Sequence, residues 1–216
     1  MRVASAYRTI SSEAVCAIAG MIPICITLAE DIECYHRRET RNVRKMARME
    51  SMTKWQQEWD NAEKGRWTYR LIPNLSAWVG RKHGEVNFHL TQFLSGHGCF
   101  RKYLHRCGHA TSPCCPACAE IEETPEHVVF DCPRFGLIRS TMLTISGVDT
   151  TPDNIVYRMC LEEDVWNAID RAIEQIMSAL QRKWREDQRV TIHSLDLNSG
   201  EAVVGDLPPP GNSPSE

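Results

Sequence analysis

Long apolar runs and familiar catalytic signatures are both missing from this chain of 216 residues. The uncharged stretch over residues 14–29 is interrupted by Gly20 and Pro23, and it is shorter than the about 20 apolar residues that a membrane helix needs. Glu13, directly before it, argues against a signal-peptide core. No P-loop, GxSxG or HExxH pattern occurs, and no neighbouring aspartates are placed to hold two Mg²⁺ ions. These absences argue against a membrane span and leave no convincing catalytic centre.

Charge is distributed unevenly along the chain, although the net charge is only −3. Residues 1–160 carry 20 basic and 17 acidic side chains, whereas residues 161–216 carry 5 basic and 11 acidic ones. A polyanion is attracted to the basic part and repelled by the acidic part. The composition therefore directs the search for a nucleic-acid surface to the first three quarters of the chain.

Three of the ten cysteines and one of the eight histidines form the pattern C-x2-C-x8-H-x4-C. They are Cys115, Cys118, His127 and Cys132. Thiolates and imidazole are zinc ligands, and four protein ligands leave no open coordination position, which predicts a structural zinc ion. The alternative is a set of unrelated reduced cysteines with a solvated or core histidine. A CxxC pair alone favours that alternative, whereas the H-x4-C pair beyond a short polar loop favours zinc. The pattern resembles a retroviral zinc knuckle with a longer middle spacer.

A metal pattern implies reduced cysteines and hence an intracellular protein. Under this interpretation five other cysteines are ordinary buried small residues. They are Cys16, Cys25, Cys34, Cys99 and Cys160.

Two groups of basic residues are candidates for nucleic-acid contact. The first group precedes the zinc pattern and combines cations with aromatic rings, as proteins that bind single-stranded nucleic acid do. It consists of Arg81, Lys82, Phe100, Arg101, Lys102, Tyr103 and Arg106. The second is a stripe on a helix expected over residues 27–59, with steps of four, three and four; it consists of Arg37, Arg41, Arg44 and Arg48. A solvated helix face explains the second group equally well.

Apolar periodicity predicts a mainly α-helical protein, with several helices around a small CCHC zinc-knuckle-like module and a disordered tail. Helical character runs over residues 3–19, and Trp55 and Trp59, four residues apart, are expected to pack inward. The clearest helix, over residues 165–184, places apolar side chains at steps of three and four. The expected segments are 1–35, a helical region; 36–106, a basic and aromatic region; 107–139, the zinc module; 140–193, amphipathic helices; and 194–216, an acidic, proline-rich disordered tail.

Several stretches, in the same order, resemble the region after the reverse transcriptase in Pol polyproteins of insect non-LTR retrotransposons. They are RVASAYRTISSEAVCAIAGMIPI (2–24), WQQEWDNAEKGRWTYRLIPNLSAWV (55–79), FHLTQFLSGHGCFRKYL (88–104) and the Cys/His cluster. The similarity is to jockey-related elements that insert into ribosomal RNA genes, the R-one clade. It maps the clade's C-terminal Cys/His motif onto Cys115, Cys118, His127 and Cys132.

The resemblance implies a C-terminal part of a larger polyprotein that carries an endonuclease and an RNA-directed DNA polymerase and performs target-primed reverse transcription. It also implies element RNA or target DNA and the rest of the polyprotein as partners, no membrane, and a nuclear location at the integration site. Mg²⁺ belongs to the polymerase and endonuclease domains, whose catalytic aspartates this chain lacks. The alternative function is a non-enzymatic adaptor, either cellular or a domesticated element fragment, that binds nucleic acid through the knuckle.

Overall fold

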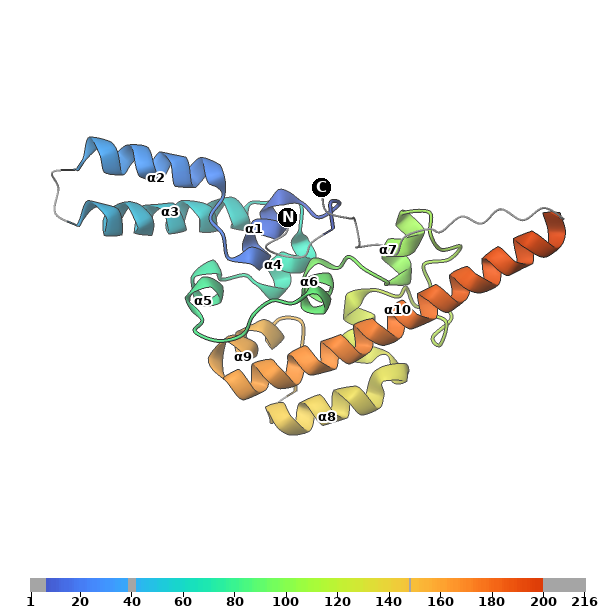
Figure 1. Cartoon of the computed structure of the whole chain (residues 1–216). Helices are drawn as coiled ribbons and strands as arrows, with labels where there is room; N and C mark the ends of the chain where they lie inside the picture. Colours follow the sequence, from blue (N-terminus) through green and yellow to red (C-terminus); the bar gives the residue numbers. More distant parts are fainter. Residues whose placement is uncertain (1–6, 39–41, 148, 200–216) are drawn as a thin grey trace.

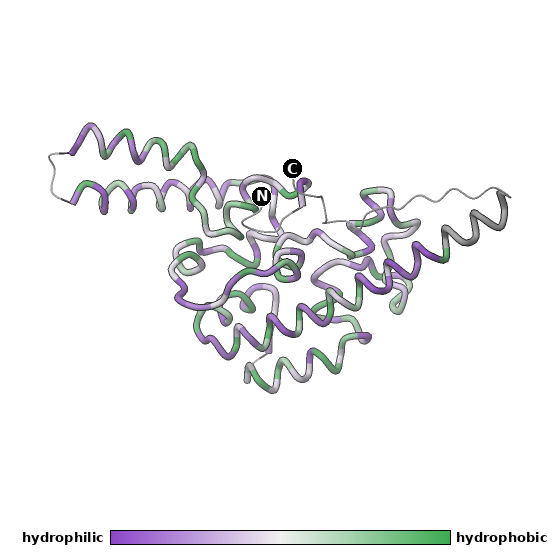
Figure 2. The backbone as a smooth tube through the Cα atoms, in the orientation of Figure 1, coloured by the Kyte–Doolittle hydropathy of each residue, from purple (hydrophilic) through white to green (hydrophobic). Residues whose placement is uncertain are grey.

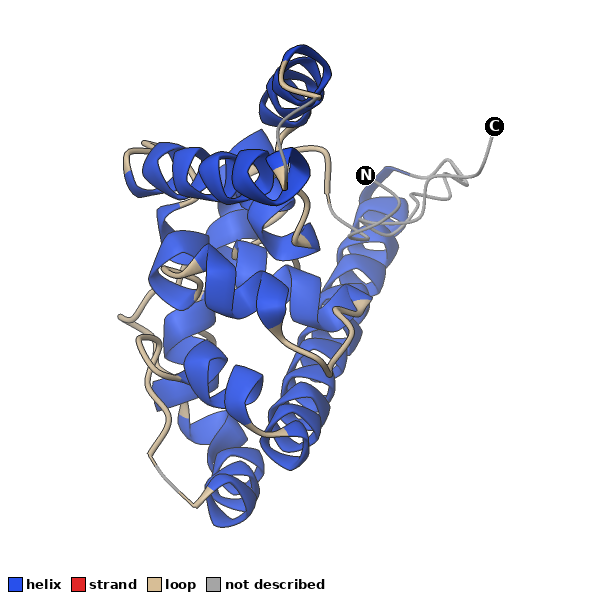
Figure 3. Ribbon diagram, turned by 90° about the vertical axis from the view of Figure 1, so that its left-hand side faces the viewer, coloured by secondary structure: helices blue, strands red, loops and turns tan. Residues whose placement is uncertain are grey.

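The computed structural model describes residues 7–38, 42–147 and 149–199, and within them it contains helices and no strand (Figures 1 and 3). Ser146 and residues 191–199 are described by their backbone only. The helices are α1 (Ser12–Ala19), α2 (Ile24–His36), α3 (Val43–Asp60), α4 (Arg66–Leu71), α5 (Leu75–Gly80), α6 (Phe88–Ser95), α7 (Arg101–Arg106), the π-helical turn η2 (His127–Asp131), the 3-10 turn η3 (Pro133–Phe135), α8 (Gly136–Ser146), α9 (Ile155–Leu161) and α10 (Glu163–Ser199). The predicted mainly helical fold is confirmed.

The first helices differ from the sequence prediction at their boundaries. α1 begins only at Ser12, where the Ser11 hydroxyl accepts a hydrogen bond from the backbone N–H of Ala14 at 3.3 Å. The single helix predicted over residues 27–59 is wrong, because α2 and α3 form an antiparallel hairpin that extends away from the rest of the molecule (Figure 1). Asn42, with a left-handed φ of 63°, is the residue directly before α3. The hairpin buries Ile26 of α2 and Ala47 of α3.

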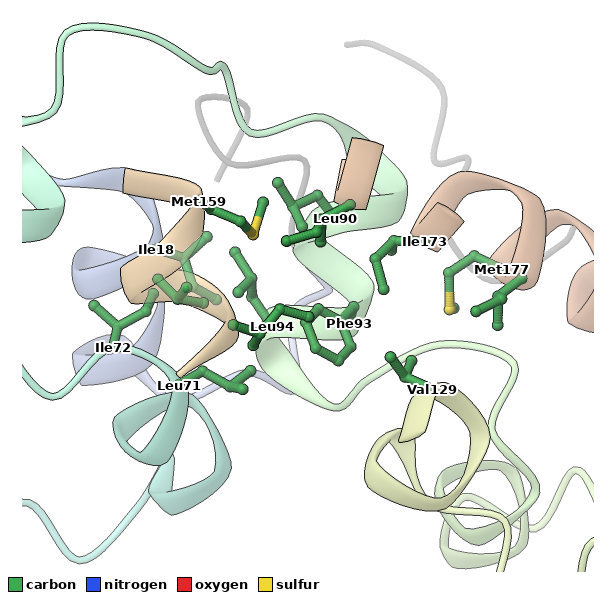
Figure 4. Close-up of a cluster of buried hydrophobic side chains, with 14 of the residues drawn as sticks. Ile18, Leu71, Ile72, Leu90, Phe93, Leu94, Val129, Met159, Ile173 and Met177 are labelled. Atoms are coloured by element: carbon green, nitrogen blue, oxygen red, sulfur yellow. The ribbon is translucent and has the colours of Figure 1, made fainter. Parts of the chain in front are cut away.

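The core lies where α1, α4, α6, α9, α10 and η2 meet (Figure 4). Leu90, Phe93 and Leu94 of α6 are fully buried at its centre. Trp55 and Trp59 are buried as predicted, and the Trp59 indole N–H donates to the carbonyl of Ile72 at 2.8 Å. The Trp59 indole therefore contributes apolar area to the core without leaving its own N–H unpaired.

Helix α10 runs through the middle of the molecule and packs against α6, α8, α9 and η2 (Figure 1). Its predicted apolar stripe is confirmed, because the side chains from Trp166 to Leu180 that face the core are buried. The helix continues to Ser199, so residues 194–199, which composition assigns to a disordered tail, are helical. Residues 200–216 lie outside the described residues.

The loop between α5 and α6 approaches α10 very closely. Gly84 has a φ of +78°, and a Cβ atom added to it would overlap the Trp166 ring. The Trp166 ring stacks on Trp78 of α5, with ring centroids 5.7 Å apart. Arg81 is half-buried, and its guanidinium lies over the Trp78 ring, 3.8 Å from the ring centroid. A glycine backbone, two indoles and a guanidinium thus join this loop to α10.

Helix α2 carries a second apolar face, directed away from α3 and into solvent. Ile24, Leu28, Ile32 and Tyr35 follow one another at steps of four, four and three and are 55–73% exposed; the alternation of apolar and polar residues along the hairpin is visible in Figure 2. Ile26, which is buried, lies on the opposite face. Among the described residues no single helix is long and apolar enough to cross a membrane, although α1 and α2 reach that composition as a pair bent by 66°.

Replacing Leu28 and Ile32 together by glutamine is expected to leave the free energy of unfolding within about 0.5 kcal/mol of the wild type, because neither side chain is buried. Replacing Ile26 by glutamine on the opposite face of the same helix should cost about 2–5 kcal/mol, since it empties a buried site of its apolar side chain. Urea unfolding of the two variants measures the difference. Equal losses of stability would show that the exposed face is covered in solution.

Candidate metal centre and basic surface

The first pair of candidate ligands is held by a tight turn after α7. The backbone N–H of Cys118 donates to the carbonyl of Cys115 at 3.2 Å, and the N–H of Cys115 donates to the carbonyl of Ile121 at 2.8 Å. Ala119 has a positive φ of 34°, which is unusual for a residue with a side chain. An isolated antiparallel bridge between Cys114 and Glu122 closes the base of the turn. The CxxC segment is therefore a knuckle whose two thiols point to one side.

The second pair is brought together by a widened helical turn. A regular α-helix turns by about 100° per residue, so two residues five apart lie on nearly opposite faces. Here η2 is a π-helical turn, and the backbone N–H of Cys132 donates to the carbonyl of His127 at 2.7 Å. The Thr124 hydroxyl accepts a hydrogen bond from the N–H of His127 at 3.0 Å, which fixes the start of the turn. The H-x4-C spacing thus places both ligands on one side.

These two turns bring the ligand atoms of all four predicted residues within 4.8 Å of one another. The Sγ atoms of Cys115 and Cys132 are 3.8 Å apart; a tetrahedral ion with Zn–S bonds of about 2.3 Å would place two sulfurs about 3.8 Å apart. Nε2 of His127 is buried and has no hydrogen-bond partner, which is costly for a neutral imidazole and ordinary for a metal ligand. The cluster could hold a metal ion such as zinc.

Arg134 supports the cluster from the outside. Its guanidinium donates to the sulfurs of Cys132 and Cys115, each at 3.3 Å, and it pairs with the carboxylate of Glu123. Burial raises the pKa of the Cys132 thiol, but the hydrogen bonds and charge of Arg134 outweigh this effect and bring the pKa below its usual value. A Zn²⁺ ion bound by three thiolates and a neutral imidazole would have a net charge of −1, which this guanidinium would offset.

Burial and the thiols of Cys115 and Cys132 raise the pKa of the Cys118 thiol to about 11. The three sulfurs therefore do not all lose their protons at neutral pH unless a cation binds, and metal binding here releases protons. Neither Arg134 nor Glu123 was expected from the ligand spacing. The only sequence signal for them is a basic residue two positions after Cys132 and an acidic one within the loop.

Glu123 joins the cluster to helix α7. Its carboxylate accepts a hydrogen bond from the backbone N–H of Arg101 at 3.1 Å, and its carbonyl accepts one from the N–H of Lys102 at 3.3 Å. Only 2% of Glu123 is exposed, so this buried carboxylate is balanced by Arg134 and the start of α7. The Cys/His cluster is thereby connected to the helix that carries Arg101, Lys102 and Arg106.

The side chains of α7 divide into an exposed basic set and a buried aromatic set. Lys102 and Arg106 are exposed and Arg101 is partly exposed. Phe100 is fully buried in the core, so the expectation that it stacks on a base is wrong. Tyr103 is 9% exposed, and its hydroxyl shares a hydrogen bond with Thr9 at 2.8 Å. Both rings pack inward because α7 is short and one of its faces covers the core.

The remaining predicted basic residues that the structure describes come from the loop after α5, the end of α2, and α3. Arg81 donates to the carbonyls of Trp78 and Gly84, so its guanidinium serves the loop structure, whereas its neighbour Lys82 is exposed. Arg37 ends α2 and pairs with Glu33, and Arg48 of α3 pairs with Glu30. The stripe predicted on a single helix is therefore wrong. Of its other members, Arg44 is exposed on α3 and Arg41 lies outside the described residues.

Burial of the other cysteines is confirmed only in part. Cys99 is buried, Cys16, Cys34 and Cys160 are half-buried, and Cys25 is exposed, contrary to the expectation. Cys107, His109 and Cys114, although close in sequence, do not belong to the four-ligand cluster.

Three curated proteins show the relationships of the chain. A "Retrovirus-related Pol polyprotein from type-1 retrotransposable element R1 4" of Nasonia vitripennis is 30% identical over 166 residues, which cover 68% of this chain and 42% of that protein. A Pol polyprotein of the R1 2 element of the same wasp is 28% identical over 159 residues, which cover 62% of this chain and 37% of that protein. An R1 polyprotein of Bradysia coprophila is 31% identical over 103 residues, covering 43% and 10%.

The chain spans less than half the length of each of these relatives. No protein-family model and no solved structure matches it. The matches agree with the resemblance seen in the motifs at residues 2–24, 55–79 and 88–104. The chain is thus a relative of the Pol polyproteins of R1 type-1 retrotransposable elements of insects.

Proposed function

We propose that this chain is a nucleic-acid-binding part of a retrotransposon Pol polyprotein, organised by a structural zinc ion and serving target-primed reverse transcription in the nucleus. The relatives are Pol polyproteins of type-1 retrotransposable elements, and this supports the place of the chain in a larger polyprotein. Polymerase and endonuclease chemistry would be supplied by other parts of that polyprotein. The proposed role of this part is to hold element RNA or target DNA.

The observation that carries the proposal is the link from the Cys/His cluster through Glu123 to the first turn of α7. When bound, zinc would cross-link Cys115, Cys118, His127 and Cys132. Arg134 and Glu123 would then transmit that fixed geometry to the backbone of α7. The exposed cations on this helix would be held in place on a rigid module, so phosphate contacts would cost little conformational entropy.

Replacing Arg101, Lys102 and Arg106 together by alanine is expected to weaken binding to single-stranded RNA and to flatten its salt dependence. Each phosphate contact on a single strand contributes about 0.7 to the slope of log K against log salt, so three lost contacts reduce the slope by up to about two units. Fluorescence anisotropy of a labelled mixed-sequence RNA, at several salt concentrations, measures both quantities.

The matched control removes the same charge elsewhere, by replacing Arg38, Arg44 and Lys45 of the α2–α3 hairpin by alanine. These side chains are exposed and are predicted to form at most a secondary surface. The slope should change less in this variant than in the α7 variant. If the wild type fails to bind RNA or single-stranded DNA at low salt, the proposed function is wrong. If the α7 variant keeps the wild-type slope, the binding surface lies elsewhere.

A further inference from the structure

The start of the basic helix α7 lies beside a basic segment of α10, which the net charge of residues 161–216 conceals. Residues 161–216 are acidic as a whole, but four of their five basic residues fall within residues 182–189. Arg182, Lys183, Arg185 and Arg189 are all exposed on α10. Arg185 is close enough to Cys99, just before α7, for its charge to counteract the burial that raises the pKa of that thiol to about 12.

One carboxylate bridges the two helices at this junction. Asp187 of α10 forms two ion pairs through different carboxylate oxygens. Its Oδ1 lies 2.9 Å from Nζ of Lys183, and its Oδ2 lies 3.8 Å from a guanidinium nitrogen of Arg101 in α7. All three side chains keep contact with solvent, being 29–54% exposed. Two cations from separate elements thus converge on a single anionic group at the surface.

A small cavity of about 110 Å³ opens at the same place. Its lining includes Arg101, Lys183, Trp184 and Asp187. Nε1 of Trp184 is buried and has no hydrogen-bond partner. A buried N–H without an acceptor costs free energy, and an oxygen-rich ligand beside it would supply the acceptor. Two cations and an unpaired N–H donor suit a tetrahedral oxyanion such as a phosphate group.

We propose that this junction binds one phosphate of a nucleic-acid backbone through Arg101 and Lys183, and that Asp187 occupies the phosphate position when no nucleic acid is bound. The inference rests on the proposed function and adds to it a site on α10. Exchange is inexpensive because an exposed ion pair contributes little, and the phosphodiester replaces one negative charge by another. Asp187 therefore acts as an internal competitor that weakens binding to the wild-type chain.

Asp187→Asn is expected to bind single-stranded RNA more tightly than the wild type, by about fivefold at low salt, which corresponds to releasing one exposed ion pair of about 1 kcal/mol. Because Arg101 and Lys183 are then free to neutralise one phosphate, the salt slope should become steeper by up to about 0.7. Lys183→Ala added to Asp187→Asn should remove about half of that increase. Anisotropy titrations with the same labelled RNA measure all of these variants.

Glu186→Gln is the matched control, since it removes one negative charge from the adjacent, exposed position without opening an ion pair to Arg101 or Lys183. It should raise affinity less than Asp187→Asn and leave the slope unchanged. Equal gains in the two variants would reduce the effect to general charge and overturn the inference. Failure of every variant and of the wild type to bind would instead refute the proposed function. Thermal melting of Asp187→Asn should match the wild type, because the pair is exposed.

Discussion

A Cys118→Ser/His127→Ala variant is expected to lose its metal ion and the folded structure around it, whereas the wild type carries one zinc ion per chain. Structural zinc sites bind with apparent free energies of about 10–16 kcal/mol, which is as large as the whole stability of an ordinary domain, about 5–15 kcal/mol. Without the ion, the variant would keep only the thiols of Cys115 and Cys132, and no cross-link would hold the two ligand-bearing turns together. Stoichiometric metal analysis and thermal unfolding measure both losses.

Cys107→Ser/His109→Ala provides the matched control, because these residues lie in the same stretch but outside the cluster. This variant should keep its zinc and most of its thermal stability. Retention of zinc by the Cys118→Ser/His127→Ala variant, or a wild type purified without zinc at neutral pH, would contradict the assignment. Because Glu123 connects the cluster to α7, loss of the metal should also weaken RNA binding.

Gly84→Ala should be among the most destabilising single substitutions in the chain. A left-handed backbone costs a residue with a Cβ about 1–2 kcal/mol, and overpacking against the Trp166 ring adds about 1–3 kcal/mol or more. Trp166 has no room to retreat, since it stacks on Trp78 and packs in the core. Urea unfolding measures the loss of stability.

Gly108→Ala separates the two contributions. Gly108 has nearly the same φ, +75° against +78°, but an added Cβ would meet open space. Its cost should be the backbone part alone, about 1–2 kcal/mol. If both substitutions cost the same, the close approach of the loop to Trp166 does not exist in solution.

The parts of the fold that follow local rules could be predicted from the sequence. The stripe of α10, the inward packing of Trp55 and Trp59 and the grouping of four metal ligands all follow from regular spacing. The α2–α3 turn could not, because residues 36–42 contain no proline or glycine, and the burial of Ile26 and Ala47 in the hairpin is a tertiary effect that local spacing does not show. Tertiary packing overrode helix propensity there.

The candidate site was predictable to the same degree. Ligand spacing identified Cys115, Cys118, His127 and Cys132, but the supporting residues Arg134 and Glu123 depend on how the turns are oriented. Phe100 was misassigned because an aromatic residue beside cations has the same sequence pattern whether it stacks on a base or fills the core. The contribution of α10 was hidden, since charge summed over residues 161–216 cancels its basic segment.

The central position of α10 also affects the order in which the molecule can fold. Leu90, Phe93 and Leu94 of α6 emerge from the ribosome long before Ile173 and Met177, the α10 side chains that share their core. Contacts between such distant segments form slowly, because a long loop must close first. Until α10 is synthesised, the part of α6 that α10 covers remains exposed to misassociation or to chaperones. Truncation within α10 should therefore affect yield of soluble protein more than its distance from the metal cluster suggests.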